Sequence, residues 1–251
     1  MKVTILGCGT STGVPRIGND WGACDPIEPK NRRRRCSILV EQGGTTLLVD
    51  TSPDLREQML DANVTHVDAV LFSHDHADQT HGIDDLRVFA MNKRRKVDVY
   101  GDADTLAALR KKFGYCFEDT RGYLAILKAH EIGQRPFQAG AIDVQPIDQD
   151  HGTMRSLGFR FGDVAYSNDL VHLPDAAFDQ LGGLKLWIVD ALRYKPHPTH
   201  SHLERTLGWI ERLKPERAVL TNMHIDLDYQ TLRRELPAGV EPGYDGMVIE
   251  A

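Results

Sequence analysis

The 251-residue sequence lacks the features that mark several large classes of protein. It has no apolar run near the roughly 18–20 residues that a membrane-spanning helix needs. Met1 and Lys2 are followed at once by the strand-like segment VTILGCG, so we expect no secretory signal. The four cysteines are scattered without a CxxC pair. This scarcity argues against a disulfide framework and favours reduced thiols in a cytoplasmic protein.

An excess of positive charge is also missing. The chain has 30 Lys and Arg against 36 Asp and Glu, a net charge of −6, and a pI near 6.0. This balance argues against general nucleic-acid binding and against binding to a membrane surface. No repeat, low-complexity stretch or long linker interrupts the sequence. We therefore predict a single globular domain over residues 1–251.

Short aliphatic segments bounded by Gly, Asp or Asn alternate with segments of helical spacing. The predicted strands are 3–7, 36–41, 45–50, 69–74, 97–101, 142–147, 157–162, 164–169, 186–191 and 218–222. The predicted helices are 54–62, 104–115, 174–182, 202–214 and 228–236. Early hairpins followed by strand–helix alternation indicate a layered, mixed α/β fold.

Metal-binding side chains cluster at the ends of these predicted strands. His74, His76 and Asp78 follow one strand at H-x-H-x-D spacing. Other candidates stand at or just after further strands, and these are Asp50, His151, Asp169, Asn222 and His224. Strand ends direct side chains into one crevice of an α/β protein. Imidazole and carboxylate groups suit zinc, manganese or iron, so the pattern predicts a metal site.

These motifs resemble those of the metallo-β-lactamase superfamily, and within it the PhnP-like phosphodiesterases that assist carbon–phosphorus lyase. The matching segments are ILGCGTSTGVP, RRRRCS, LLVDTSPD, HDHAD, GIDDLR, VAYSNDLVHLP, THSHLERTL and GYDGMVI. The resemblance runs from end to end of the chain. It implies a four-layer αβ/βα sandwich, in which two mixed β-sheets face each other and helices cover the outside.

The resemblance also implies roles for individual residues. It implies the ligands of two neighbouring metal ions: His74, His76 and His151 for the first ion, Asp169 bridging both, and Asp78 for the second. Asp50 is implied to support the metal-binding loop from behind, which fixes the orientation of its ligands. The expected metal is zinc or manganese, with one tightly bound ion and a weaker second one.

Two departures from the family pattern affect the second ion. The family places histidines where this chain has Gln79 and Asn222. Three interpretations remain open at this stage. The amide oxygens of both residues could hold a harder ion such as manganese or magnesium. His224 could swing in as the replacement ligand, or the second site could be weak or empty.

The remaining candidates concern the substrate. Arg34 and Arg35 lie in the run RRRR, and a guanidinium matches phosphate oxygens bidentately. The resemblance implies His200 as the general acid for a leaving alkoxide. His202 either binds substrate or caps the following helix. Asp78 is available for proton transfer if no second metal binds it.

We therefore expect a metal-dependent phosphodiesterase that uses a metal-activated hydroxide. Its partner would be a small phosphodiester, such as a cyclic ribose phosphate or a nucleotide-like ester, and a homodimer stays open. Within the same scaffold, lactone or thioester hydrolysis is an alternative, and the acidic pI argues against RNA 3′-end processing. A nucleotide-binding module with impaired turnover is the alternative from a different class.

Overall fold

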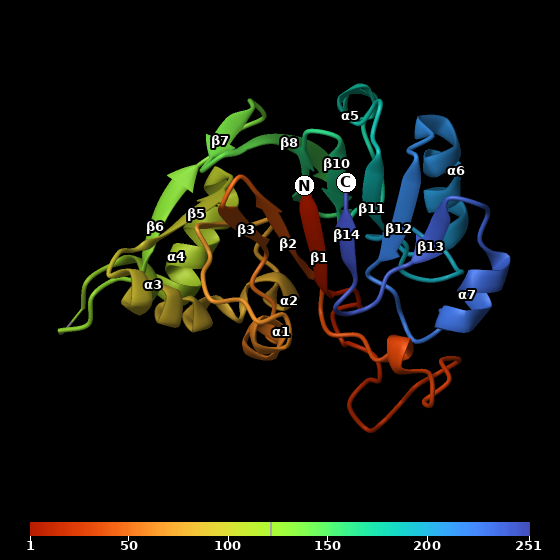
Figure 1. Ribbon diagram of the computed structural model, residues 1–251, viewed down its shortest axis with the longest axis horizontal. Helices are drawn as coiled ribbons and strands as arrows, with labels where there is room; N and C mark the ends of the chain where they lie inside the picture. The colour runs from red at the N-terminus through yellow and green to blue at the C-terminus, as the bar shows by residue number, and fades with distance from the viewer. Residues whose placement is uncertain (121) are drawn as a thin grey trace.

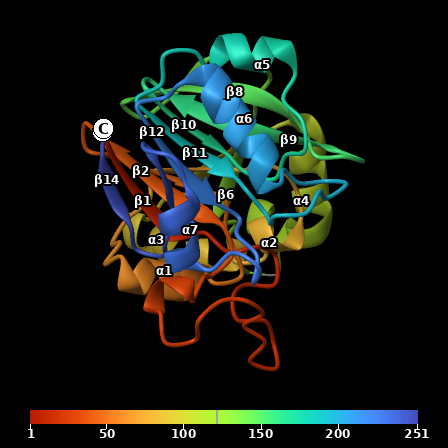
Figure 2. The same ribbon diagram turned by 90° about the vertical axis from the view of Figure 1, so that its right-hand side faces the viewer.

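The computed structural model describes residues 1–120 and 122–251 as two facing β-sheets with helices on their outer surfaces (Figures 1 and 2). The first sheet has the strand order β14 (Val248–Glu250), β1 (Lys2–Gly7), β2 (Ser37–Gln42), β3 (Thr45–Val49), β4 (Ala69–Leu71), β5 (Val97–Gly101) and β6 (Leu127–Glu131). The second has the order β13 (Val240–Pro242), β12 (Arg217–Thr221), β11 (Leu186–Asp190), β10 (Val164–Ser167), β9 (Arg155–Phe161), β8 (Ile142–Asp150) and β7 (Phe137–Ala139). The predicted sandwich of two mixed sheets is confirmed.

Each sheet combines an antiparallel half with a parallel half. Strands β14, β1, β2 and β3 pair antiparallel, and β3 to β6 pair parallel. In the second sheet β7 to β10 are antiparallel, and β10 to β13 are parallel. Parallel pairing needs crossover connections, which here are mostly helical. Most of the predicted metal ligands follow strands of the parallel halves, and His151 follows the antiparallel strand β8.

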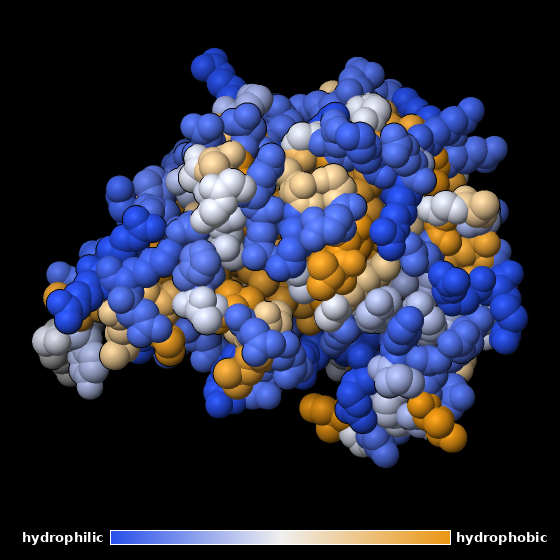
Figure 3. All heavy atoms as spheres, viewed as in Figure 1, coloured by the Kyte–Doolittle hydropathy of each residue, from blue (hydrophilic) through white to orange (hydrophobic). Residues whose placement is uncertain are grey.

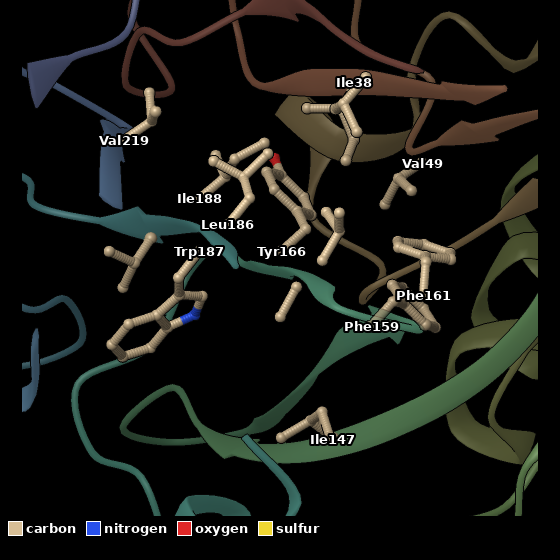
Figure 4. Packing of buried hydrophobic residues seen from close by; sticks show 14 of the residues in the cluster. Ile38, Val49, Ile147, Phe159, Phe161, Tyr166, Leu186, Trp187, Ile188 and Val219 are labelled. Atoms are coloured by element: carbon tan, nitrogen blue, oxygen red, sulfur yellow. The ribbon is translucent and has the colours of Figure 1, made fainter. Parts of the chain in front are cut away.

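Alternation along the strands separates the space between the sheets from the outer layers. Ile38 and Val49 of the first sheet belong to the core between the sheets, toward which Tyr166 of the second sheet also points (Figure 4). Trp187 points to the opposite face of the second sheet from its neighbours Leu186 and Ile188 (Figure 4). Because successive side chains point to opposite faces, each strand contributes residues to the space between the sheets and to the layer beneath the outer helices.

The outer faces are covered by helices. Apolar residues of α1 (Leu55–Asp61), α3 (Arg87–Lys93) and α4 (Ala103–Phe117) pack on the first sheet. Apolar residues of α5 (Asp175–Gln180), α6 (Leu203–Leu213) and α7 (Tyr229–Glu235) belong to the hydrophobic core that includes the second sheet. The short segments α2 (Ala77–Thr80), η1 (Pro29–Asn31) and η2 (Ile83–Leu86) lie in connections. In the described part of the chain, no helix is both long and apolar enough to cross a membrane.

A long loop between β1 and β2 projects from the body of the molecule (Figure 1). Figure 3 shows hydrophobic side chains at the end of this projection, and Ile17 and Ile27 of the loop are exposed. At its base the loop runs beside the segment after β12: Ala23 N donates to Ile225 O at 2.9 Å, and Trp21 packs with Cys24 and Ile225. The loop thus reaches the edge where β12 delivers Asn222 and His224.

Candidate metal centre

Three histidines from the two sheets meet at one point. His74 and His76 follow β4 in the first sheet, and His151 follows β8 in the second. The ring centroids of His74 and His76 are 4.6 Å apart, and each lies 5.1 Å from the ring of His151. One nitrogen from each ring lies within 4.8 Å of the other two. The structure therefore brings together the three histidines that the sequence predicted for the first ion.

The hydrogen bonding and the pKa values of these imidazole rings suit the binding of a metal cation. His74 Nδ1 lies 3.0 Å from Ser73 Oγ, while its Nε2 is buried and has no hydrogen-bond partner among the described residues. His151 Nδ1 lies 2.7 Å from the carbonyl oxygen of Thr199, which leaves Nε2 toward the centre. Burial lowers the pKa of His151 to about 4 and that of His74 well below its usual range. Neutral imidazoles with a free nitrogen are the form that binds a metal.

Asp50 lies behind the metal-binding loop, where the sequence analysis placed it. Its two oxygens accept hydrogen bonds from Ser73 N and Ser73 Oγ, both at 2.8 Å. Because Ser73 Oγ also contacts His74 Nδ1, Asp50 acts on the ligand through Ser73. Burial raises the pKa of Asp50 to about 7. Such a chain of contacts fixes the direction of the metal-binding nitrogen.

The Asp169 carboxylate is buried beside the three histidines. Its Oδ2 accepts from Gln79 Nε2 at 2.7 Å and from Asn168 Nδ2 at 3.0 Å, and it lies 3.9 Å from His74 Nε2. Its Oδ1 accepts from Asn222 Nδ2 at 3.0 Å. Burial raises the pKa of Asp169 well above its usual range. Gln79 and Asn222 therefore face Asp169 with their amide nitrogens.

His200 is held by two carboxylates. Its Nδ1 lies 3.2 Å from Asp190 Oδ2 and 3.2 Å from Asp169 Oδ1. Burial alone would lower the pKa of His200, but the hydrogen bond to Asp190 and the charges of both carboxylates raise it to about 9. With Nδ1 engaged, Nε2 is the atom left to meet a substrate. Asp190, fully buried at the end of β11, was missed by the sequence analysis.

Other predicted residues lie at the edge of the centre. Asp78 is half-buried and accepts a long hydrogen bond from Gln79 Nε2 at 3.4 Å. His224 contacts Arg16 through Nε2 and Asp226 through Nδ1, the latter at 3.3 Å, so both ring nitrogens face other residues. His224 as a replacement ligand therefore gains no support from these contacts.

The predicted substrate-binding residues have other contacts. Arg34 pairs with Asp61 at 2.7 Å and lines a pocket of about 390 Å³ that contains none of the metal-binding histidines. Arg35 pairs with Asp54 at 3.1 Å. His202 is the N-cap residue of α6, yet its side chain makes no capping hydrogen bond. A substrate role for any of these residues stays a prediction.

Lys112 of α4 is a further residue that sequence reasoning missed. Its Nζ donates to the backbone oxygen of Asp75 at 2.5 Å and to Asp75 Oδ2 at 2.6 Å. Asp75 stands between His74 and His76, so the ammonium group ties the metal-binding loop to α4. We expect Lys112→Met to weaken metal binding about tenfold or more, because loss of a supporting contact typically costs 10–100-fold.

Metal titration of Lys112→Met, with Lys111→Met as the control on an exposed neighbouring position, checks this expectation. Lys112→Arg should retain most of the affinity. Equal affinities for the two methionine variants would show that Lys112 does not position the loop.

Two facing seven-stranded sheets with a histidine cluster at the strand ends define a class of metallohydrolase fold. Residues 45–225 match the Beta-lactamase superfamily domain. The chain belongs to this superfamily and, within it, to the PhnP family, as shown by a solved diphosphatase of that family. The two chains are 35% identical with a TM-score of 0.93, and the match covers 99% of this chain and 96% of the diphosphatase.

Two other proteins are similar to this chain. An octanoyltransferase of Porphyromonas gingivalis is 32% identical over 253 aligned positions, which cover 98% of this chain and 51% of that protein. The chain thus spans about half the length of this curated relative. Zn²⁺-bound PqqB from Methylobacterium extorquens, 17% identical with a TM-score of 0.76 over the whole of both chains, shares the fold.

Proposed function

We propose that the protein is a metal-dependent phosphodiesterase acting on small nucleotide-like or cyclic ribose phosphodiesters. The observation that carries this proposal is the Asp190–His200 pair beside the metal-binding histidines. An alkoxide leaving from phosphorus is strongly basic and needs a proton, whereas a thiolate leaving from a thioester needs one far less. A histidine held by a buried aspartate supplies that proton. The PhnP-family diphosphatase provides further support, since its name also denotes cleavage at phosphorus.

The residues divide the work as follows. A divalent ion, zinc or manganese in this proposal, would supply a water of lowered pKa and neutralise charge on the phosphate. His74, His76 and His151 would hold it, with Asp169 Oδ2 as a nearby oxygen. His200 donates a proton from Nε2 to the departing oxygen while Asp190 keeps Nδ1 in place. General acid catalysis of this kind contributes about 10²–10⁴ in rate.

Arg16 is a candidate for binding the substrate phosphate. It contacts His224, two residues beyond Asn222, whose amide touches Asp169. Its ion pair with Asp20 is long, at 3.7 Å, whereas Arg34 pairs with Asp61 at 2.7 Å. The Arg16 guanidinium is therefore held less tightly by a carboxylate than that of Arg34. We therefore favour Arg16 over Arg34 for this role.

Turnover assays on a panel of substrates test the proposal. We expect the protein to hydrolyse bis-p-nitrophenyl phosphate when manganese is added and to lose this activity on chelation. A nucleoside diphosphate ester should be included because of the diphosphatase relative, and an octanoyl thioester and a lactone because of the alternatives. Turnover of the thioester or lactone without any phosphoester would contradict the proposal. Binding of nucleotide without release of any product would indicate a binding module instead.

A further inference from the structure

The surroundings of Asp169 differ from those of a carboxylate shared between two cations. Three side-chain amides point their nitrogens at it: Gln79 and Asn168 at Oδ2, and Asn222 at Oδ1. His200 Nδ1 also lies 3.2 Å from Oδ1. An amide nitrogen donates hydrogen bonds and has no lone pair to offer a metal. Both carboxylate oxygens of Asp169 therefore accept hydrogen bonds from side-chain amides.

The groups of candidate metal ligands can together hold only one ion, for the following reason. Within residues 1–120 and 122–251, two groups could hold a metal: His74, His76 and His151, and His151, Asp169 and His200. Both need a nitrogen of His151, whose Nδ1 is already bonded to Thr199 O. One remaining nitrogen can serve one ion. In the first group His74 Nε2 is buried and free of partners, whereas in the second His200 Nδ1 is already bonded to Asp190.

We propose that this centre holds a single metal ion, and that the amides of Gln79 and Asn222 stand in for a second ion as partners of Asp169. Each amide satisfies one carboxylate oxygen by donating a hydrogen bond, which removes the need for a second cation. The proposal rests on the metal site of the proposed function and does not depend on the identity of the substrate.

The orientation of Gln79 supports this assignment. Its Nε2 is 2.7 Å from Asp169 Oδ2, while its Oε1 is buried without a hydrogen-bond partner in the described part of the chain. Turning the amide round would place its oxygen at hydrogen-bonding distance from a carboxylate oxygen, which repels it. The amide therefore faces Asp169 although its own oxygen is left unsatisfied, a condition that costs about 1–3 kcal/mol. A buried polar group in this condition is uncommon in native proteins.

The metal content of the purified protein tests how many ions the centre binds. After dialysis against a weak chelator, we expect about one equivalent of metal per chain by mass spectrometry of the elements. The double variant Gln79→His with Asn222→His should retain about two, because it replaces both donors by ligands. Two tightly held ions in the unmodified protein would overturn the proposal. Absence of any bound metal at saturating zinc or manganese would overturn it together with the metal site of the proposed function.

A second experiment, which measures the melting temperature of a single variant, does not need the double variant. Gln79→Glu places a second carboxylate against Asp169 in a buried site, and a bound cation would relieve the repulsion between the two. Its melting temperature should rise with added manganese after the first ion is saturated, whereas that of the unmodified protein should not. Gln138→Glu on the exposed face of β7 is the matched control. A further manganese-dependent rise in the unmodified protein after the first ion is saturated would contradict the proposal, whatever its activity on phosphodiesters.

Discussion

Replacing His74 or His151 by alanine is expected to abolish both metal binding and hydrolysis. Each histidine contributes one of the three nitrogens that lie within 4.8 Å of one another, so the loss of either leaves the ion with too few ligands. Loss of a supporting residue typically weakens metal binding 10–100-fold, and loss of a direct ligand should exceed about 100-fold. Elemental analysis and titration of the apo-protein measure the effect.

His172→Ala is the matched control for these variants. The His172 side chain is exposed, and the contacts described for the residue involve only its backbone. This variant should keep its metal and its activity. Full metal content in both His74→Ala and His151→Ala would refute the assignment of the site.

The second large effect is expected for His200. His200→Ala should slow substrates with poor alkoxide leaving groups about 10²–10⁴-fold, because these depend on the proton that His200 supplies. Nitrophenyl esters, whose leaving group needs little protonation, should lose less than roughly tenfold. The ratio of kcat/KM for the two kinds of substrate is the measurement.

Two further variants sharpen this test. Asp190→Asn keeps the shape of the residue that holds His200 Nδ1, and it should reproduce part of the leaving-group dependence. His202→Ala, next to the start of α6, should affect both kinds of substrate alike. Equal losses on both substrates for His200→Ala would assign His200 a structural role.

The ten strands predicted from the sequence all exist, since each is a short segment of continuous or alternating apolar residues with clear boundaries. The four that were missed lack that signal. Strands β7, β13 and β14 have three residues each, and β6, with the sequence LKAHE, mixes charged and apolar residues. All four are the edge strands of the two sheets, where pairing depends more on a neighbouring strand than on their own sequence.

The metal-binding histidines could be predicted because two of them share one short loop with a recognisable spacing. Asp190 could not, because it ends the apolar segment LWIVD and looks like an ordinary strand boundary. Its pattern does match that of Asp50, an acidic residue directly after an apolar strand, and this signal could have found it. The direction of the Gln79 and Asn222 amides is beyond any sequence pattern, since it depends on what lies opposite each side chain.

Three residues of the centre share an unusual backbone conformation. Asp50, Asp169 and Asn222 follow strands and have φ angles of 62°, 50° and 60°. Alanine in this left-handed region costs about 1–2 kcal/mol, whereas asparagine, aspartate and histidine are several-fold enriched there. Alanine scanning at these positions would therefore report strain as well as chemistry. Exchange among Asn, Asp and His would change the chemistry of the side chain without adding backbone strain, so position 222 can change between a hydrogen-bond donor and a metal ligand while the main chain keeps its conformation.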